Sequence, residues 1–164
     1  MLPLVAPSLS KCIGENETVL SSHLFEDDTS KLTLAYERLF EIPKTIVERF
    51  SDHIKYLDIS HNKITNLDAL VYFKSLTSLI ADGNPVTENC YLPPLPKLEL
   101  LWLNRCQIAS LYPWVGKLKE SCPNLQYLSL MGNPAAPSYF NGADDKRKYL
   151  RNGWTNFDGT LTGR

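Results

Sequence analysis

The sequence of 164 residues predicts an α/β solenoid, in which a curved parallel sheet lines one side and short helical or 3-10 segments line the other. Three observations predict this fold. Aliphatic residues recur in a fixed order, successive copies lie about 22 residues apart, and asparagine usually stands at the same place in each copy. Such fixed spacing is typical of proteins built from stacked units, because each unit buries its apolar face only against its neighbours.

The clearest copy starts at Ile54 and reads I-x-x-L-x-I-x-x-N-x-I. Three further copies keep this register and start at Leu76, Leu98 and Leu125, so the successive spacings are 22, 22 and 27 residues. A degenerate copy starts at Thr29, with glutamate in place of the asparagine. The order of residues matches the leucine-rich repeat, whose units run about 20 to 29 residues. We therefore predict about five leucine-rich repeats.

Each repeat is expected to supply one short strand around its L-x-L centre, followed by a return along the convex side. Residues 67–73 are predicted to return as a 3-10 turn or a short helix. Residues 112–122 are predicted to form a helix, because their apolar residues are spaced to face one side and a proline follows.

The repeats are expected to occupy residues 31–140. Residues 1–30 are predicted to be a flexible start and an N-terminal cap, because the first strand needs cover over its open edge. Residues 141–164 are predicted to be an atypical C-terminal tail or partial cap, because the repeat pattern fades there among glycines, prolines and charges.

The composition indicates an ordinary folded protein, with 43% hydrophobic residues, 21% charged residues and a net charge of −1. The balanced charge argues against general nucleic-acid binding, because no broad basic field attracts phosphates. No apolar stretch approaches the roughly 18 to 20 residues needed to cross a bilayer, and the cysteines do not form Cys-x-x-Cys pairs. We expect a cytoplasmic, monomeric protein without a transmembrane segment.

The residues at the asparagine position of the template are expected to be structural, with side chains that turn inward and bond the backbone of neighbouring turns. We call them the ladder residues: Asn62, Asn84, Cys106 and Asn133. No catalytic residue is predicted, because motifs such as G-x-S-x-G and H-E-x-x-H are missing from the sequence and its histidines are isolated. No metal site and no cofactor are predicted, since the sequence has neither a phosphate loop nor a calcium loop.

The residues that flank the buried leucines of each strand should point out of the concave face of the sheet. They are rich in aromatic and apolar residues and poor in charge, which is the composition of a protein-binding hot spot. The predicted contact residues are Tyr56, Asp58, His61, Ile80, Asp82, Leu100, Trp102, Asn104, Arg105, Tyr127, Ser129 and Met131. The alternative is that flanking loops or the tail fold over them.

A basic run, Lys146-Arg147-Lys148 with Tyr149 and Arg151, has the residue types that touch the phosphates of RNA or acidic lipid. Two aspartates precede it, and three basic residues are a weak signal. We therefore interpret the run as a solvated helix face and expect no direct contact with nucleic acid.

At its repeats the chain resembles the short intracellular leucine-rich-repeat families with 22-residue units, which include a phosphatase regulator, the spliceosomal A-prime protein and the acidic nuclear phosphoproteins. Residues 92–98, Leu-Pro-Pro-Leu-Pro-Lys-Leu, and residues 123–134, Pro-Asn-Leu-Gln-Tyr-Leu-Ser-Leu-Met-Gly-Asn-Pro, are more closely similar to the leucine-rich melanocyte differentiation-associated family. This likeness covers about residues 30–140.

The closer resemblance implies a non-enzymatic adaptor for a Rab family GTPase and for membrane trafficking, acting in melanosome biogenesis and melanocyte differentiation. The broader resemblance implies instead a regulatory or scaffold subunit of a phosphatase or of a ribonucleoprotein complex. Members of the closer family usually end the array with a Tyr-Arg pair and a Leu-Pro-x-Leu-x-x-Leu-Asp stretch. Here residues 144–164 contain only Lys148-Tyr149-Leu150-Arg151, so any partner site in that closing segment is not expected to carry over.

Overall fold

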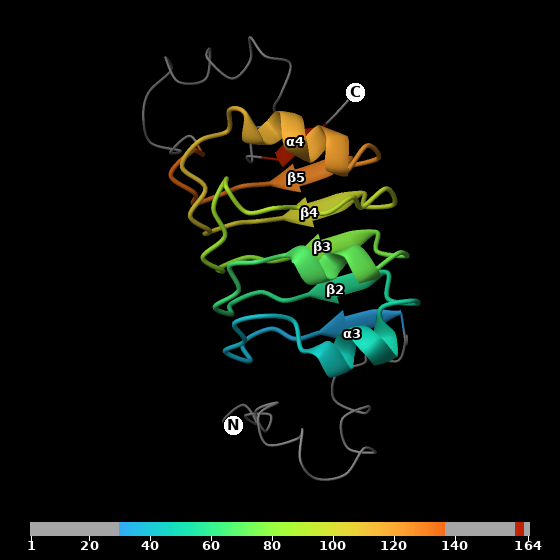
Figure 1. Ribbon diagram of the computed structural model, residues 1–164. Coiled ribbons are helices and arrows are strands. Elements are labelled where there is room, and N and C mark those ends of the chain that lie inside the picture. Colours follow the sequence, from blue (N-terminus) through green and yellow to red (C-terminus); the bar gives the residue numbers. More distant parts are fainter. Residues whose placement is uncertain (1–29, 137–159, 163–164) are drawn as a thin grey trace, which may run out of the picture.

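One sheet, whose six strands follow the order of the sequence, forms the framework of the molecule (Figure 1). The computed structural model describes residues 30–136 and 160–162. Strands β1 to β5 run parallel, and β6 runs antiparallel to β5. The strands are β1 (Lys31–Thr33), β2 (Tyr56–Asp58), β3 (Ser78–Ile80), β4 (Leu100–Trp102), β5 (Tyr127–Ser129) and β6 (Thr160–Thr162).

The central leucines of the five parallel strands pair with one another in register. They are Leu32, Leu57, Leu79, Leu101 and Leu128. Each is at most 1% exposed, and together they form the middle of one continuous core. Because side chains alternate along a strand, this register also fixes which residues point outward. The predicted parallel sheet of a leucine-rich repeat is confirmed.

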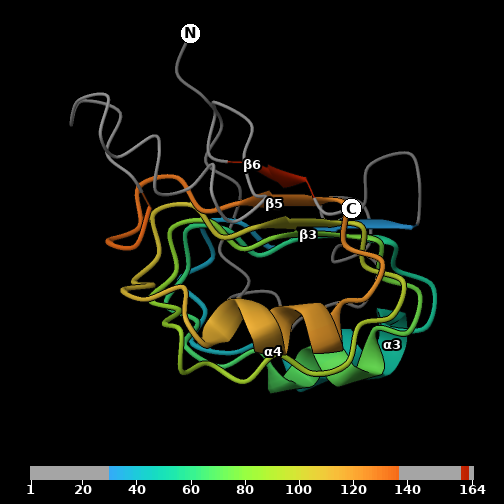
Figure 2. The same cartoon turned by 90° about the horizontal axis from the view of Figure 1, so that it is seen from above.

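Helical segments cover one side of the sheet (Figure 2). They are α3 (Lys44–Phe50), the 3-10 helix η1 (Asp68–Tyr72) and α4 (Trp114–Ser121). Helices η1 and α4 lie within the segments predicted to be helical, and α4 buries Trp114 and Leu118 against the core. Helix α3 was not predicted, since it has one buried residue, Ile46, and no side-chain hydrogen bond at its N-terminus.

The backbone of β6 pairs with β5, with Leu161 opposite Leu128. The sequence predicted a tail or partial cap in this region and did not identify a strand. The predicted N-terminal start and cap, the basic run Lys146-Arg147-Lys148 and the other tail residues named above lie outside the described residues. The boundaries between repeats and ends therefore stay a prediction.

Candidate protein-binding site

The ladder asparagines bind the backbone of two successive repeats. The Asn84 side chain donates to the carbonyl oxygens of Ile59 and Ala81, both at 3.0 Å, and its Oδ1 accepts from the Ile64 N–H at 3.0 Å. Asn62 and Asn133 make the corresponding bonds in their own repeats. All three are at most 6% exposed. Their polar atoms are therefore engaged within the fold and are not offered to a partner.

The fourth ladder residue, Cys106, bonds its neighbours more weakly. Its Sγ lies 3.6 Å from the carbonyl oxygens of Ala81 and Asn104. Burial raises the pKa of the Cys106 thiol to about 11, and burial raises the pKa of the Cys122 thiol to about 12. Cys90 is half-buried, and its pKa is also raised chiefly by burial. Because only a thiolate is an effective nucleophile, these three free thiols are poorly suited to catalysis.

The outward side chains of β1 to β5, on the side away from the helices, form what we call the strand face. Figure 2 shows this side of the sheet opposite α3 and α4. Strand pairing arranges its residues in two adjacent rows. In one row the paired residues are Lys31, Tyr56, Ser78, Leu100 and Tyr127, and in the other they are Thr33, Asp58, Ile80, Trp102 and Ser129.

A hydrogen-bond network crosses three strands of this face and engages several predicted contact residues. Both carboxylate oxygens of Asp82 accept bonds from Asn104, one from its backbone N–H at 2.8 Å and one from its side chain at 3.0 Å. Asn104 Oδ1 accepts from the Ser129 hydroxyl at 2.6 Å and from the Met131 N–H at 2.7 Å. Ser129 is only 4% exposed and its hydroxyl is directed to Asn104, so the expectation that it contacts a partner does not fit its position.

The exposed apolar side chains of the strand face gather over β4 and β5. Trp102 is 38% exposed, Tyr127 is 51% exposed and Met131 is 42% exposed, while Leu100 is half-buried. We call these four residues, together with exposed Arg105, the β4–β5 patch. They are neighbours because Leu100 pairs with Tyr127, and adjacent strands lie about 4.8 Å apart. Tyr56, Asp58 and His61 belong to the β2 repeat and lie outside this patch.

The residue just before each ladder position has a left-handed backbone conformation. The φ angles are 63° at Tyr36, 55° at His61, 66° at Gly83, 51° at Arg105 and 74° at Gly132. The first four donate their backbone N–H to a carbonyl of the next repeat, at 2.7 to 3.0 Å. The left-handed turn is thus a recurring feature of the repeat, and Gly132 adopts it as well. Two of the five positions hold glycine, which adopts a left-handed conformation at no steric cost. These glycines are the feature by which the five equivalent positions could be recognised in the sequence.

In the first repeats, aromatic rings stack on one another at these left-handed positions. Tyr36 is 71% exposed, and its ring stacks on the His61 ring with centroids 4.4 Å apart and planes 14° apart. His61 in turn lies over Gly83, where an added Cβ would come within 2.7 Å of the His61 Nδ1. The sequence could not predict this stacking, because it depends on a turn conformation that hydrophobic periodicity does not report.

Two features that often mark metal or catalytic sites are absent from the described residues. Among residues 30–136 and 160–162, no three histidines, cysteines or acidic residues come together as metal ligands would. In the same part of the chain, every buried side-chain nitrogen and oxygen has a hydrogen-bond partner. The helices described above are too short and too polar to traverse a bilayer.

The repeats of this chain are similar in sequence to those of known leucine-rich-repeat proteins. Residues 29–86 match the family model described as leucine rich repeat. The human leucine-rich melanocyte differentiation-associated protein is 42% identical over 101 residues, which make up 59% of this chain and 51% of the relative. The chain therefore spans about half the length of the curated relative it matches. Leucine-rich repeats as a class are protein-interaction domains.

Proposed function

Because the chain is a leucine-rich-repeat protein, with repeats similar to those of the leucine-rich melanocyte differentiation-associated protein, we propose that it is a non-enzymatic adaptor that binds another protein on its strand face. The β4–β5 patch is the observation that supports this proposal. It combines tryptophan, tyrosine, methionine and arginine, the residue types enriched in protein interfaces. In this proposal the strand face is the concave side of the array.

Exposed aromatic residues also occur elsewhere, but those of the return segments between β2 and β5 stand singly, whereas the patch residues adjoin. Tyr72, Tyr91 and Tyr112 are 58%, 61% and 89% exposed, but each belongs to a different return segment between strands. Single exposed apolar residues are normal on protein surfaces, whereas adjoining ones indicate an interaction site. In the patch, Leu100 and Trp102 project from the same face of one strand, and Tyr127 lies beside Leu100 on the next.

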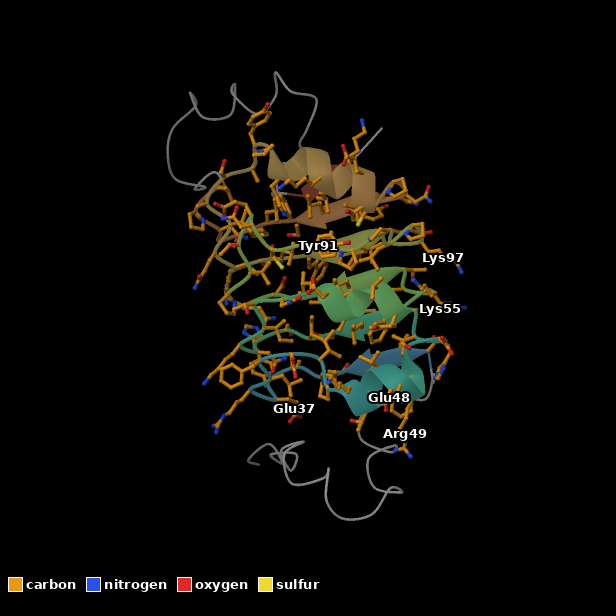
Figure 3. All side chains as sticks on the ribbon, in the orientation of Figure 1. Glu37, Glu48, Arg49, Lys55, Tyr91 and Lys97 are labelled. Atoms are coloured by element: carbon orange, nitrogen blue, oxygen red, sulfur yellow. The ribbon has the colours of Figure 1, made fainter. Side chains whose placement is uncertain are left out.

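The test compares Trp102→Ala with a matched aromatic truncation on the helical side. Tyr91 provides the control, since it is more exposed than Trp102 and its neighbour Leu92 accepts a hydrogen bond at 3.0 Å from Ser121 of α4 (Figure 3). Proximity labelling in cells should identify proteins that wild type and Tyr91→Ala share and that Trp102→Ala loses. The melting temperature is measured for both variants, because Trp102 is only 38% exposed and a lost protein counts as a binding effect only where the fold stays intact.

The result that contradicts the proposal is equally specific. If Trp102→Ala retains every labelled protein, or if Tyr91→Ala loses the same ones, the strand face is not the binding surface. Phosphatase or ribonucleoprotein components among the proteins lost would favour the scaffold function implied by the broader resemblance.

The finer form of the proposal is a cytoplasmic adaptor linked to a Rab family GTPase in melanosome biogenesis. It is supported by the family resemblance and by the relative's association with melanocyte differentiation, which its name states. Titration of the purified chain against a panel of Rab proteins loaded with GDP or a GTP analogue should give binding that depends on the nucleotide and weakens in Trp102→Ala. Binding to none of them would remove the Rab assignment and leave the adaptor function untouched. Equal binding of both variants would place the Rab site outside the strand face.

A further inference from the structure

We propose that the partner presents an aspartate or glutamate among apolar side chains, and that Arg105 binds this carboxylate while the rest of the β4–β5 patch packs on the apolar residues. This inference rests on the proposed function and specifies the chemistry of its partner. It is carried by the place of Arg105 in the array, by the space that Gly132 leaves for it, and by the charges around it.

The backbone conformation of Arg105 is unfavourable for any residue other than glycine. Its φ is 51°, in the left-handed region, and the turn is held by its N–H bond to the Met131 carbonyl at 2.7 Å. Glycine fills the equivalent places at Gly83 and Gly132 without steric cost. The same conformation occurs at the equivalent place in the other repeats, so it belongs to the fold; what distinguishes Arg105 is a long charged side chain where Gly83 and Gly132 have none.

The next repeat leaves room for the arginine side chain. A Cβ built on Gly132 would lie 3.1 Å from Arg105 Cγ, so a larger residue there would press on the arginine stem. Because Gly132 has no side chain, the stem lies over its backbone, next to Met131. The backbone bond from the Arg105 N–H to the Met131 carbonyl places the arginine beside an exposed apolar residue of the patch. Arg105 itself is exposed, and its side chain makes no ion pair or hydrogen bond with any residue of the described ranges 30–136 and 160–162.

The negative charges nearest the centre of the face are already engaged. Asp82 uses both carboxylate oxygens to accept bonds from Asn104, and Asp58 accepts the Ser60 N–H at 2.9 Å. The charge that stands unengaged beside the apolar side chains is thus the positive one of Arg105. Arginine binds carboxylates through two parallel hydrogen bonds, which gives such a pair both orientation and strength at an interface rim.

The experiment selects peptides from a random library displayed on phage, using the full chain as bait and Trp102→Ala bait to discard peptides that bind elsewhere. Enriched peptides should carry Asp or Glu close to apolar residues. Replacing that acid by its amide should weaken binding to wild type roughly fivefold to tenfold, and Arg105→Gln should weaken binding of the acidic peptide by a similar factor. Combining both changes should add little further loss, because both remove one interaction.

Two variants separate binding from structure. Arg105→Gly should lose the same affinity and keep or raise the melting temperature, since glycine fits the left-handed turn, and Arg105→Lys should recover only part of the affinity. Peptides that need Trp102 but bind Arg105→Gln equally well overturn this inference and leave the adaptor function standing. A library that yields no Trp102-dependent peptide contradicts both. A further outcome is that Arg105→Gln and the double variant Asp144→Asn/Asp145→Asn lower the melting temperature equally. That result would show that Arg105 pairs with acidic residues of the chain's own tail, and it would overturn the proposal.

Discussion

Replacing Asn84 by alanine should reveal how much the ladder contributes to stability. The change leaves the buried Ile64 N–H without its acceptor, which costs about 1 to 3 kcal/mol. It also removes the bonds to Ile59 and Ala81, but these carbonyls keep their bonds to Asn62 and Cys106. These two losses should therefore add about 1 kcal/mol. We expect the free energy of unfolding to fall by roughly 2 to 4 kcal/mol in total.

Equilibrium unfolding in urea, followed by tryptophan fluorescence, measures this change. Asn89→Ala is the matched control, because Asn89 is exposed and should cost no more than about 0.5 kcal/mol. A loss below about 1 kcal/mol for Asn84→Ala would show that water or a backbone shift satisfies the Ile64 N–H, and the reasoning from buried polar groups would be wrong for this fold.

Three further predictions test other parts of the structure. Leu101→Ala should lower the free energy of unfolding by about 2 to 5 kcal/mol, because the fully buried leucine leaves a cavity; a urea midpoint near that of wild type would refute the core assignment. Gly83→Ala should lower the free energy of unfolding by about 1 to 2 kcal/mol, since alanine is strained in the left-handed conformation and its Cβ displaces His61. Gly116→Ala is the control, because Gly116 lies in a helix with open space around it, and its melting temperature should be equal to that of wild type or higher. A lower melting temperature for Gly116→Ala than for Gly83→Ala would contradict this reasoning. Burial raises the pKa of the Cys106 thiol to about 11, so the stabilisation from keeping this thiol protonated should be fully present below the ordinary thiol pKa of about 8.5. The free energy of unfolding should then fall as the pH rises toward 11. This fall should be less steep in Cys106→Ala, and an unchanged slope would exclude the thiol as its cause.

The repeat fold could be predicted from the sequence because its cause is periodic. Leu57, Leu79, Leu101 and Leu128 stand at the same place in successive copies, and stacking equal units is the one way to bury all of them together. The helix α4 could be predicted for a similar reason, since Trp114 and Leu118 lie on one helical face. Periodicity therefore predicted the elements whose formation depends on burial.

Sequence periodicity gives no information about contacts made sideways between strands. Asp82 and Asn104 each have the spacing of an exposed residue, yet the register places their polar groups 2.8 to 3.0 Å apart and ties them together. The Ser129 hydroxyl is tied to Asn104 in the same way. Helix α3 has a helical signal in Ile46, Val47 and Phe50, but this signal spans little more than one turn and was missed. Strand β6 has only three residues, too few to show an alternation.

The one cysteine in the ladder has a consequence for the cooperativity of unfolding. A repeat array behaves as a line of units, in which the weakest coupling between neighbours decides where the array separates. The junction between the β3 and β4 repeats has the weak thiol contacts of Cys106 where other junctions have an amide, and the Asp82–Asn104 pair bridges that same junction from the outer surface. The array should therefore unfold in one transition while this pair is intact, and Asp82→Ala should divide it into two.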